Sequence, residues 1–225
     1  MQPKKPQGVK GPLGISPAGM TIHPVEFPTA KPERELLIAN IFVNGSRRLA
    51  SDPLVPFSDP KLNPECDLDI SITVANGQRR KLELVEYAPL DLFGGKYANV
   101  PSNHLTGDVA KSIVKLIKKK SAHYAGNSNL LLIYTTENAF SVPSPALELI
   151  RRMLSGQKLA FERIYFLSPH STTEGSTSLV YPREPHDWYA RWDSMYLASR
   201  VLRGINVRDI QRSDENREGI TFSLD

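Results

Sequence analysis

The segment of residues 66–88 constrains the fold of this chain more than any other, because it predicts two paired strands that both carry carboxylates. Residues 66–74 read CDLDISITV, in which apolar and polar side chains alternate with the two-residue period of a strand. Asn76-Gly77 is a typical hairpin turn, and residues 81–88 (KLELVEYA) form the second predicted strand. Carboxylates are costly to bury without a positive partner. The hairpin therefore indicates a divalent cation and phosphoryl chemistry.

Composition is typical of an ordinary globular protein with one domain. The 225 residues are 40% hydrophobic and 23% charged. The single cysteine, Cys66, excludes an internal disulfide and a zinc site of four thiolates. No apolar run approaches the ~20 residues of a membrane span. These features predict a soluble protein of the reducing cytoplasm that does not contact membranes.

Several common catalytic motifs are missing from the sequence. There is no G-x-x-x-x-G-K-[ST] phosphate loop and no G-x-S-x-G elbow, and the five histidines are widely separated. No small-molecule cofactor is therefore expected. The net charge of +4 is compatible with nucleic acid as a partner but does not require it.

Three regions follow from the chain pattern. Residues 1–30, with six prolines and four glycines, are predicted to be a flexible basic tail, and residues 211–225 a polar C-terminal tail. Residues 31–210 are predicted to be a single α/β domain with a mixed sheet flanked by helices. Its expected helices are 33–44, 108–124, 145–154 and 187–202, its strands are 67–74, 81–88, 130–134, 162–167 and 178–181, and residues 51–65 and 89–105 are expected loops.

This order of elements, with acids on two strands, resembles the PD-(D/E)xK nuclease-like superfamily over residues 33–134. Members of that superfamily have a helix, a three-stranded antiparallel meander, a helix and a strand, with an acid on one strand and Glu-x-Lys on the next. The resemblance implies a restriction-endonuclease-like fold and a hydrolase that cleaves nucleic-acid phosphodiesters with Mg²⁺ (or Mn²⁺). Asp67 or Asp69 would be the first acid and Glu83 the second, and together they would bind the metal.

The chain departs from the superfamily two residues after Glu83, where Val85 replaces the catalytic lysine. Lys81 shares a strand face with Glu83, and Lys111 or Lys115 could reach in from the following helix. The remaining alternative is that no lysine replaces it. The protein would then be a catalytically inactive nuclease-fold module that binds nucleic acid or a protein partner.

The register of the hairpin is open at this stage. A two-residue loop at Asn76-Gly77 pairs Asp67 with Glu86, and so puts Glu86 on the face of the aspartates. A three-residue loop or a bulge shifts the pairing by one residue and puts Glu83 beside them instead. The resemblance favours Glu83, and Glu86 is retained as the alternative metal ligand.

Two further groups of charged residues lie on predicted helices. Lys111, Lys115 and Lys118 share one helix face, which would either bind a phosphate backbone or face solvent. Glu33 and Glu35 lie where some superfamily members place an additional metal-side acid, although acids are also favourable at any helix N-terminus. Small homodimers are common for this fold, and the sequence distinguishes neither the oligomeric state nor DNA from RNA.

Overall fold

The structure, a computed structural model, describes residues 9–16, 19–49, 51–63, 69–90, 95, 106–124, 128–137 and 140–182. Asp67 and the expected helix at 187–202 lie outside these residues, as do the expected C-terminal tail and most of the loop at 89–105. No helix within the described residues is long and apolar enough to cross a membrane.

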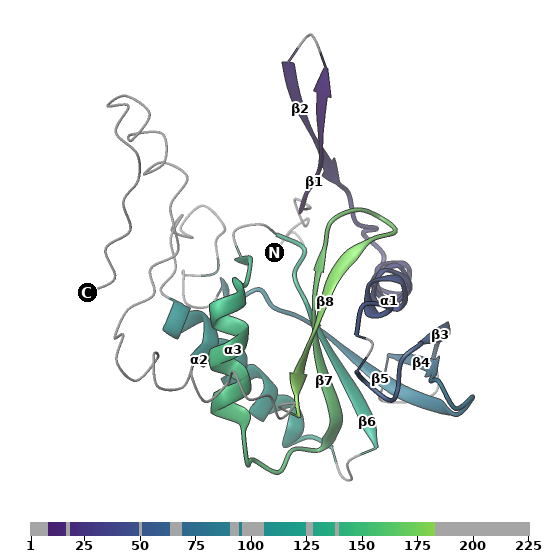
Figure 1. Ribbon diagram of the computed structural model, residues 1–225, viewed down its shortest axis with the longest axis vertical. Coiled ribbons are helices and arrows are strands. Elements are labelled where there is room, and N and C mark those ends of the chain that lie inside the picture. Colours follow the sequence, from purple (N-terminus) through teal and green to yellow (C-terminus); the bar gives the residue numbers. More distant parts are fainter. Residues whose placement is uncertain are drawn as a thin grey trace.

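A six-stranded mixed sheet forms the centre of the molecule, with its strands in sequence order from one edge to the other (Figure 1). Neighbouring strands are antiparallel except for β5–β6 and β6–β7, which are parallel. The strands are β3 (Ser58–Leu62), β4 (Ile70–Thr73), β5 (Arg79–Glu86), β6 (Asn129–Tyr134), β7 (Phe161–Pro169) and β8 (Gly175–Tyr181).

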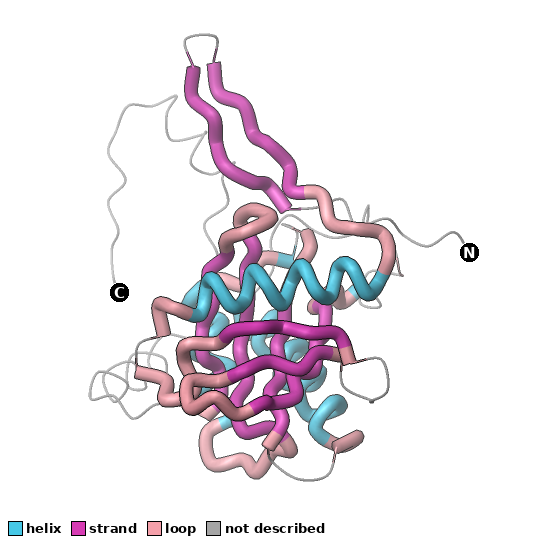
Figure 2. The backbone as a smooth tube through the Cα atoms, turned by 90° about the vertical axis from the view of Figure 1, so that its right-hand side faces the viewer, coloured by secondary structure: helices cyan, strands magenta, loops and turns pink. Residues whose placement is uncertain are grey.

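Helices cover both faces of this sheet, which confirms the predicted α/β class. Helix α1 (Lys31–Ser46) lies across one face (Figure 2). Helices α2 (Thr106–Ser121) and α3 (Ser144–Leu154) lie on the other face (Figure 1). Strand β6 is buried over Leu130–Tyr134 because it is central, and its side chains alternate between the two hydrophobic cores.

The turn between β4 and β5 sets the register that the sequence left open. Val74 N–H donates to the Gln78 carbonyl (3.0 Å), so residues 75–77 form a three-residue loop, with Gly77 at φ 79°. The ladder pairs Ile70 with Leu82, not with Glu83. The two-residue loop is therefore wrong, and the one-residue shift puts Glu83 at the level of Asp69.

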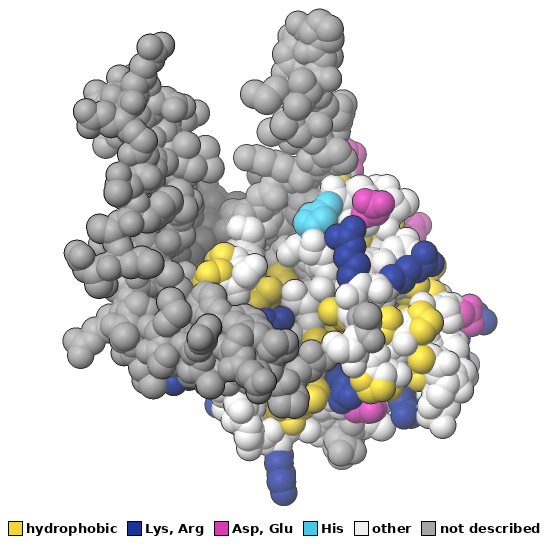
Figure 3. All heavy atoms as spheres, in the orientation of Figure 1, with side chains coloured by type: hydrophobic (Ala, Val, Ile, Leu, Met, Phe, Trp, Pro, Cys, Tyr) yellow, Lys and Arg dark blue, Asp and Glu magenta, His cyan; other side chains and the backbone are white. Residues whose placement is uncertain are grey.

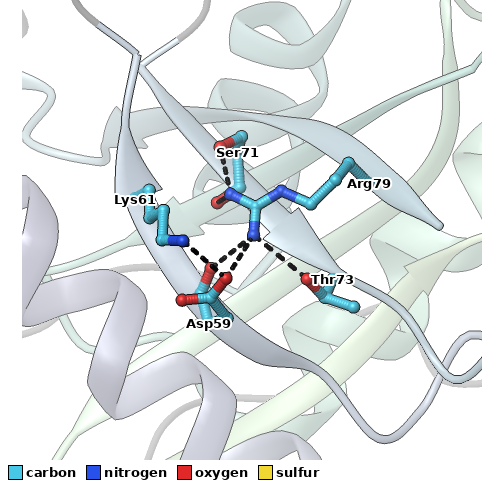
Figure 4. A network of polar contacts seen from close by, with 5 residues as sticks. All are labelled: Asp59, Lys61, Ser71, Thr73 and Arg79. Atoms are coloured by element: carbon cyan, nitrogen blue, oxygen red, sulfur yellow. Dashed lines mark hydrogen bonds and ion pairs between the residues drawn. The ribbon is translucent and has the colours of Figure 1, made fainter. Parts of the chain in front are cut away.

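Strand β3 lies within the expected loop at 51–65, so that expectation is wrong for residues 58–62. Its sequence SDPKL is mostly exposed and contains proline, as the edge of a sheet allows, and so it lacks the apolar alternation of a strand. Arg79 secures it: its guanidinium donates to Asp59 Oδ2 (2.7 Å) and to Thr73 Oγ1 (3.0 Å), and contacts Ser71 (Figure 4). Lys61 and Arg79 hold the pKa of the Asp59 carboxyl below its usual value.

Within residues 1–30, expected to be a flexible basic tail, the structure has an antiparallel hairpin of β1 (Val9–Ser16) and β2 (Gly19–Val25). The hairpin projects from the sheet (Figures 1 and 2). Its register places Leu13 opposite Ile22 and Ile15 opposite Met20. Apolar residues therefore occupy opposed positions along it, and the surrounding prolines and glycines conceal this pattern in the sequence.

Candidate active site

Two acids and a lysine converge on the α1 face of the sheet. Lys31 Nζ lies 3.1 Å from Glu35 Oε1 and 3.4 Å from Asp69 Oδ1. The two carboxylates are largely buried, with 10% and 15% of their side-chain surface exposed, whereas 69% of the Lys31 side chain is exposed. The cluster therefore combines enclosed acids with an amine that solvent reaches.

Local backbone geometry positions each member of this cluster. Lys31 and Glu35 are four residues apart in the first turns of α1, and thus lie on one face of the helix. Asp69 directly precedes β4, and its Oδ2 accepts a hydrogen bond from the Leu84 N–H of β5 (2.9 Å). Because the β4–β5 ladder ends at Ile70, that N–H is available to a side chain. The bond fixes the orientation of the Asp69 carboxylate.

The charges in this cluster perturb one another. Burial and the neighbouring Asp69 carboxylate raise the pKa of Glu35, and the Lys31 ammonium only partly offsets them. Hydrogen bonding to Glu35 in turn raises the pKa of Lys31 above its usual value of 10.5. Lys31 is therefore charged at neutral pH, and Glu35 takes up a proton more readily than an exposed glutamate.

Glu86, the alternative ligand, lies at the carboxyl end of β5 near a second group of polar residues. Its Oε1 accepts a hydrogen bond from the Thr136 hydroxyl. Burial, followed by the charge of Glu86, raises the pKa of Tyr134, whereas Arg34 of α1 lowers it. The charge of Glu35 raises the pKa of Tyr134 further, as the smallest of these effects.

Glu83, the favoured metal ligand, faces the opposite side of the sheet. Its Oε1 lies 2.5 Å from Lys120 Nζ near the end of α2, with 5% of the Glu83 side chain exposed. Its Oε2 is buried without a hydrogen-bond partner. The shifted register puts Glu83 and Asp69 at one level, but their side chains bond to lysines of helices on opposite faces.

The lysines proposed as replacements lie elsewhere. Lys81, Lys111 and Lys115 are exposed, as is Lys118 of the predicted nucleic-acid-binding face, and the lysines seen to pair with Asp69 and Glu83 are Lys31 and Lys120. The sequence offered one signal for Lys31, which is its four-residue spacing from Glu35. Lys120 gave no such signal, because a lysine in the last turn of a helix is favourable there whatever it contacts.

The cluster on the α1 face fits Mg²⁺ by the chemistry of its donors. Mg²⁺ is commonly held by one or two carboxylates, with water and substrate phosphate supplying the other ligands. Glu35 and Asp69 provide two such carboxylates. Among the described residues, which exclude Asp67, no group of three or more His, Cys, Asp or Glu side chains is arranged for a metal.

Comparison with known proteins gives no relative from which to argue. No protein-family model, no curated protein and no solved structure matches the chain. The candidate site must therefore be interpreted from its own chemistry.

Proposed function

We propose that this chain is a metal-dependent nuclease related to the PD-(D/E)xK class, with Lys31 of α1 as its lysine. The observation that carries the proposal is the approach of the Lys31 amine to Glu35 (3.1 Å) and Asp69 (3.4 Å) at one point of the α1 face. Two carboxylates and an ammonium group are the components that metal-assisted phosphodiester hydrolysis uses.

The order of elements also supports this class. Helix α1, the antiparallel meander β3-β4-β5, helix α2 and the parallel strand β6 follow one another along the chain. This is the order of the superfamily that the sequence resembles. Fold order alone does not define a reaction, and so the proposal rests on the cluster.

Glu35 and Asp69 are the residues that would hold Mg²⁺. When bound, the ion would polarise the phosphoryl group and lower the pKa of a coordinated water. The Leu84 N–H keeps the Asp69 carboxylate in one orientation. Lys31 remains protonated, and its exposed ammonium is available to compensate the charge that develops on a bound phosphate.

Nicking of supercoiled plasmid with Mg²⁺ or Mn²⁺ tests the proposal. Glu35→Gln, Asp69→Asn and Lys31→Met should each lower the nicking rate about a hundredfold or more, because the first two weaken the binding of the metal and the third removes the positive charge at the phosphate. Glu33→Gln is the matched control, since Glu33 is an exposed acid in the same helical turn. Equal nicking by the Asp69→Asn variant and the wild type would refute the proposed site.

The second candidate is an inactive module that binds nucleic acid. Two observations favour it: Val85 stands at the usual lysine position, and Glu83 is already neutralised by its ion pair with Lys120. If the protein bound plasmid but nicked it with neither Mg²⁺ nor Mn²⁺, this alternative would be supported.

A further inference from the structure

A cavity of about 290 Å³ lies between α2 and the carboxyl end of β5. Helix α2 supplies one wall, with residues at positions that share a helix face. The segment that leaves β5 supplies the other. The described residues that line it are Glu86, Tyr87, Ala88, Pro89, Ser112, Lys115, Leu116 and Lys119.

The cavity combines a positive rim with an apolar wall. Lys115 and Lys119 are one helical turn apart, and no hydrogen bond or ion pair to another described residue engages either ammonium group. Leu116 and Pro89 contribute apolar surface to the lining. The one acid in the lining, Glu86, already accepts a hydrogen bond from Thr136. An anion with an apolar portion would complement these walls.

The described side chains on the visible side of the molecule carry positive charge in several places. Figure 3 shows lysine and arginine side chains in separate groups among neutral and apolar atoms on that face. Helix α2 itself carries Lys111, Lys118 and Lys120 besides the two lysines of the cavity, so the cavity pair is distinguished by lining the cavity and not by its charge alone. The volume of the cavity is also close to the ~300 Å³ at which small-molecule sites begin.

The cavity and the candidate active site lie on opposite faces of the sheet. Helix α2 walls the cavity, whereas the cluster of Lys31, Glu35 and Asp69 lies on the α1 face. A nucleic-acid strand that occupied both would have to pass around the carboxyl end of β5.

We propose that this cavity binds one nucleotide of a nucleic-acid strand. Its phosphate lies between Lys115 and Lys119, and its base packs against Leu116 and Pro89. This inference rests on the proposed function and defines a substrate subsite for it. The proposal also separates the exposed lysines of α2 into two groups. Lys115 and Lys119 line the cavity, whereas Lys111 and Lys118 do not.

The test is binding of a short fluorescent single-stranded DNA oligonucleotide in EDTA, measured by anisotropy over a range of KCl concentrations. Lys115→Glu/Lys119→Glu should weaken binding about tenfold more than Lys111→Glu/Lys118→Glu, a pair with the same change of charge on the same helix. The slope of log K against log salt should fall by about 0.7 for each phosphate that no longer pairs with a lysine. Circular dichroism of both pairs controls for folding, and Lys115→Gln/Lys119→Gln should show a smaller loss in the same direction.

Competition by thymidine 5′-monophosphate and by inorganic phosphate tests whether the base packs against the apolar part of the cavity. The nucleotide should displace the oligonucleotide at a lower concentration, because only the nucleotide has a base for the apolar wall. Equal displacement would refute the place given to the base. If the two lysine pairs lost binding equally, the proposed subsite would be refuted, and the oligonucleotide would bind to the general positive charge of α2.

These measurements are independent of hydrolysis because EDTA removes the metal. Selective loss in the cavity pair, without any nicking by the wild type, would support the subsite and refute the nuclease. Nicking by the wild type without a selective loss of binding in the cavity pair would support the nuclease and refute the subsite.

Discussion

Glu35 is a carboxyl group whose protonation the folded chain favours. Its pKa is raised in the fold by burial and by Asp69, so the folded state binds this proton more tightly than the unfolded state does. The contribution to stability is fully present below the ordinary value of 4.5 and is lost as pH rises through the folded pKa. The free energy of unfolding of wild type should therefore fall over that window relative to that of Glu35→Gln.

Urea unfolding at a series of pH values measures this difference. Because the glutamine resembles the protonated acid, the two proteins should behave most alike at the acidic end. The Glu33→Gln variant controls for the general effect of removing an acid from α1. A gap between Glu35→Gln and wild type that did not change with pH would contradict the assigned perturbation.

Lys120 neutralises an acid that is otherwise enclosed. Lys120→Met would leave the Glu83 carboxylate buried without its partner, and should destabilise the fold by about 2–3 kcal/mol. The double variant Glu83→Gln/Lys120→Met should recover part of that loss, because no unpaired charge remains. A double-mutant cycle by chemical denaturation measures the coupling, and strictly additive losses would contradict it.

At the scale of elements, helix α1 packs closely against strand β8. A Cβ on Gly45 would lie 2.6 Å from the Gly175 carbonyl oxygen and 2.7 Å from Thr177 Oγ1. Gly45→Ala should therefore destabilise the protein by about 1–3 kcal/mol through overpacking. Gly107→Ala in α2 is the control, because nothing lies within 4 Å of its Cβ and alanine favours helix. Equal thermal midpoints for the two variants would argue against this packing.

Elements whose sequence signal is local were predicted, and features that depend on distant residues or on backbone conformation were not. Strand β6 was predicted from its apolar run, since a central strand buries both faces. Strand β3 was missed because an exposed edge needs no apolar pattern and depends on Arg79, which follows it by many residues. The register of β4 and β5 depended on the positive φ of Gly77, and a sequence pattern alone does not distinguish the two loop lengths.

The candidate site was partly predictable for the same reason. Asp69 and Glu35 were recognised as acids near a predicted strand and helix. The contact of Lys31 with Asp69 spans 38 residues of sequence and forms only when α1 packs on the sheet. The pairing of Glu83 with Lys120 was not predictable, because the strand position of Glu83 does not reveal which α2 side chain will lie beside it.

At the scale of the whole molecule, the proposed metal site should couple to folding. A ligand that binds only the folded state stabilises it by about 2.7 kcal/mol at a hundred times its dissociation constant. Glu35 and Asp69 come together only through the packing of α1 against the β4–β5 end of the sheet, so the unfolded chain offers no such pair. Mg²⁺ should therefore raise the thermal midpoint of the wild type in a concentration-dependent way.

Thermal unfolding in EDTA and in increasing MgCl₂ measures that linkage without any substrate. The increase should disappear in the double variant Glu35→Gln/Asp69→Asn and persist in Glu33→Gln, which removes a charge from the same helix but not from the cluster. KCl at matched ionic strength separates specific binding from screening. Because Glu83 faces the other side of the sheet, its replacement by glutamine should leave the Mg²⁺ dependence intact even where it lowers the midpoint in EDTA. If instead Glu83→Gln abolished the dependence while Glu35→Gln/Asp69→Asn preserved it, the metal would belong to the Lys120 face and the α1 cluster would be only an ion-pair network.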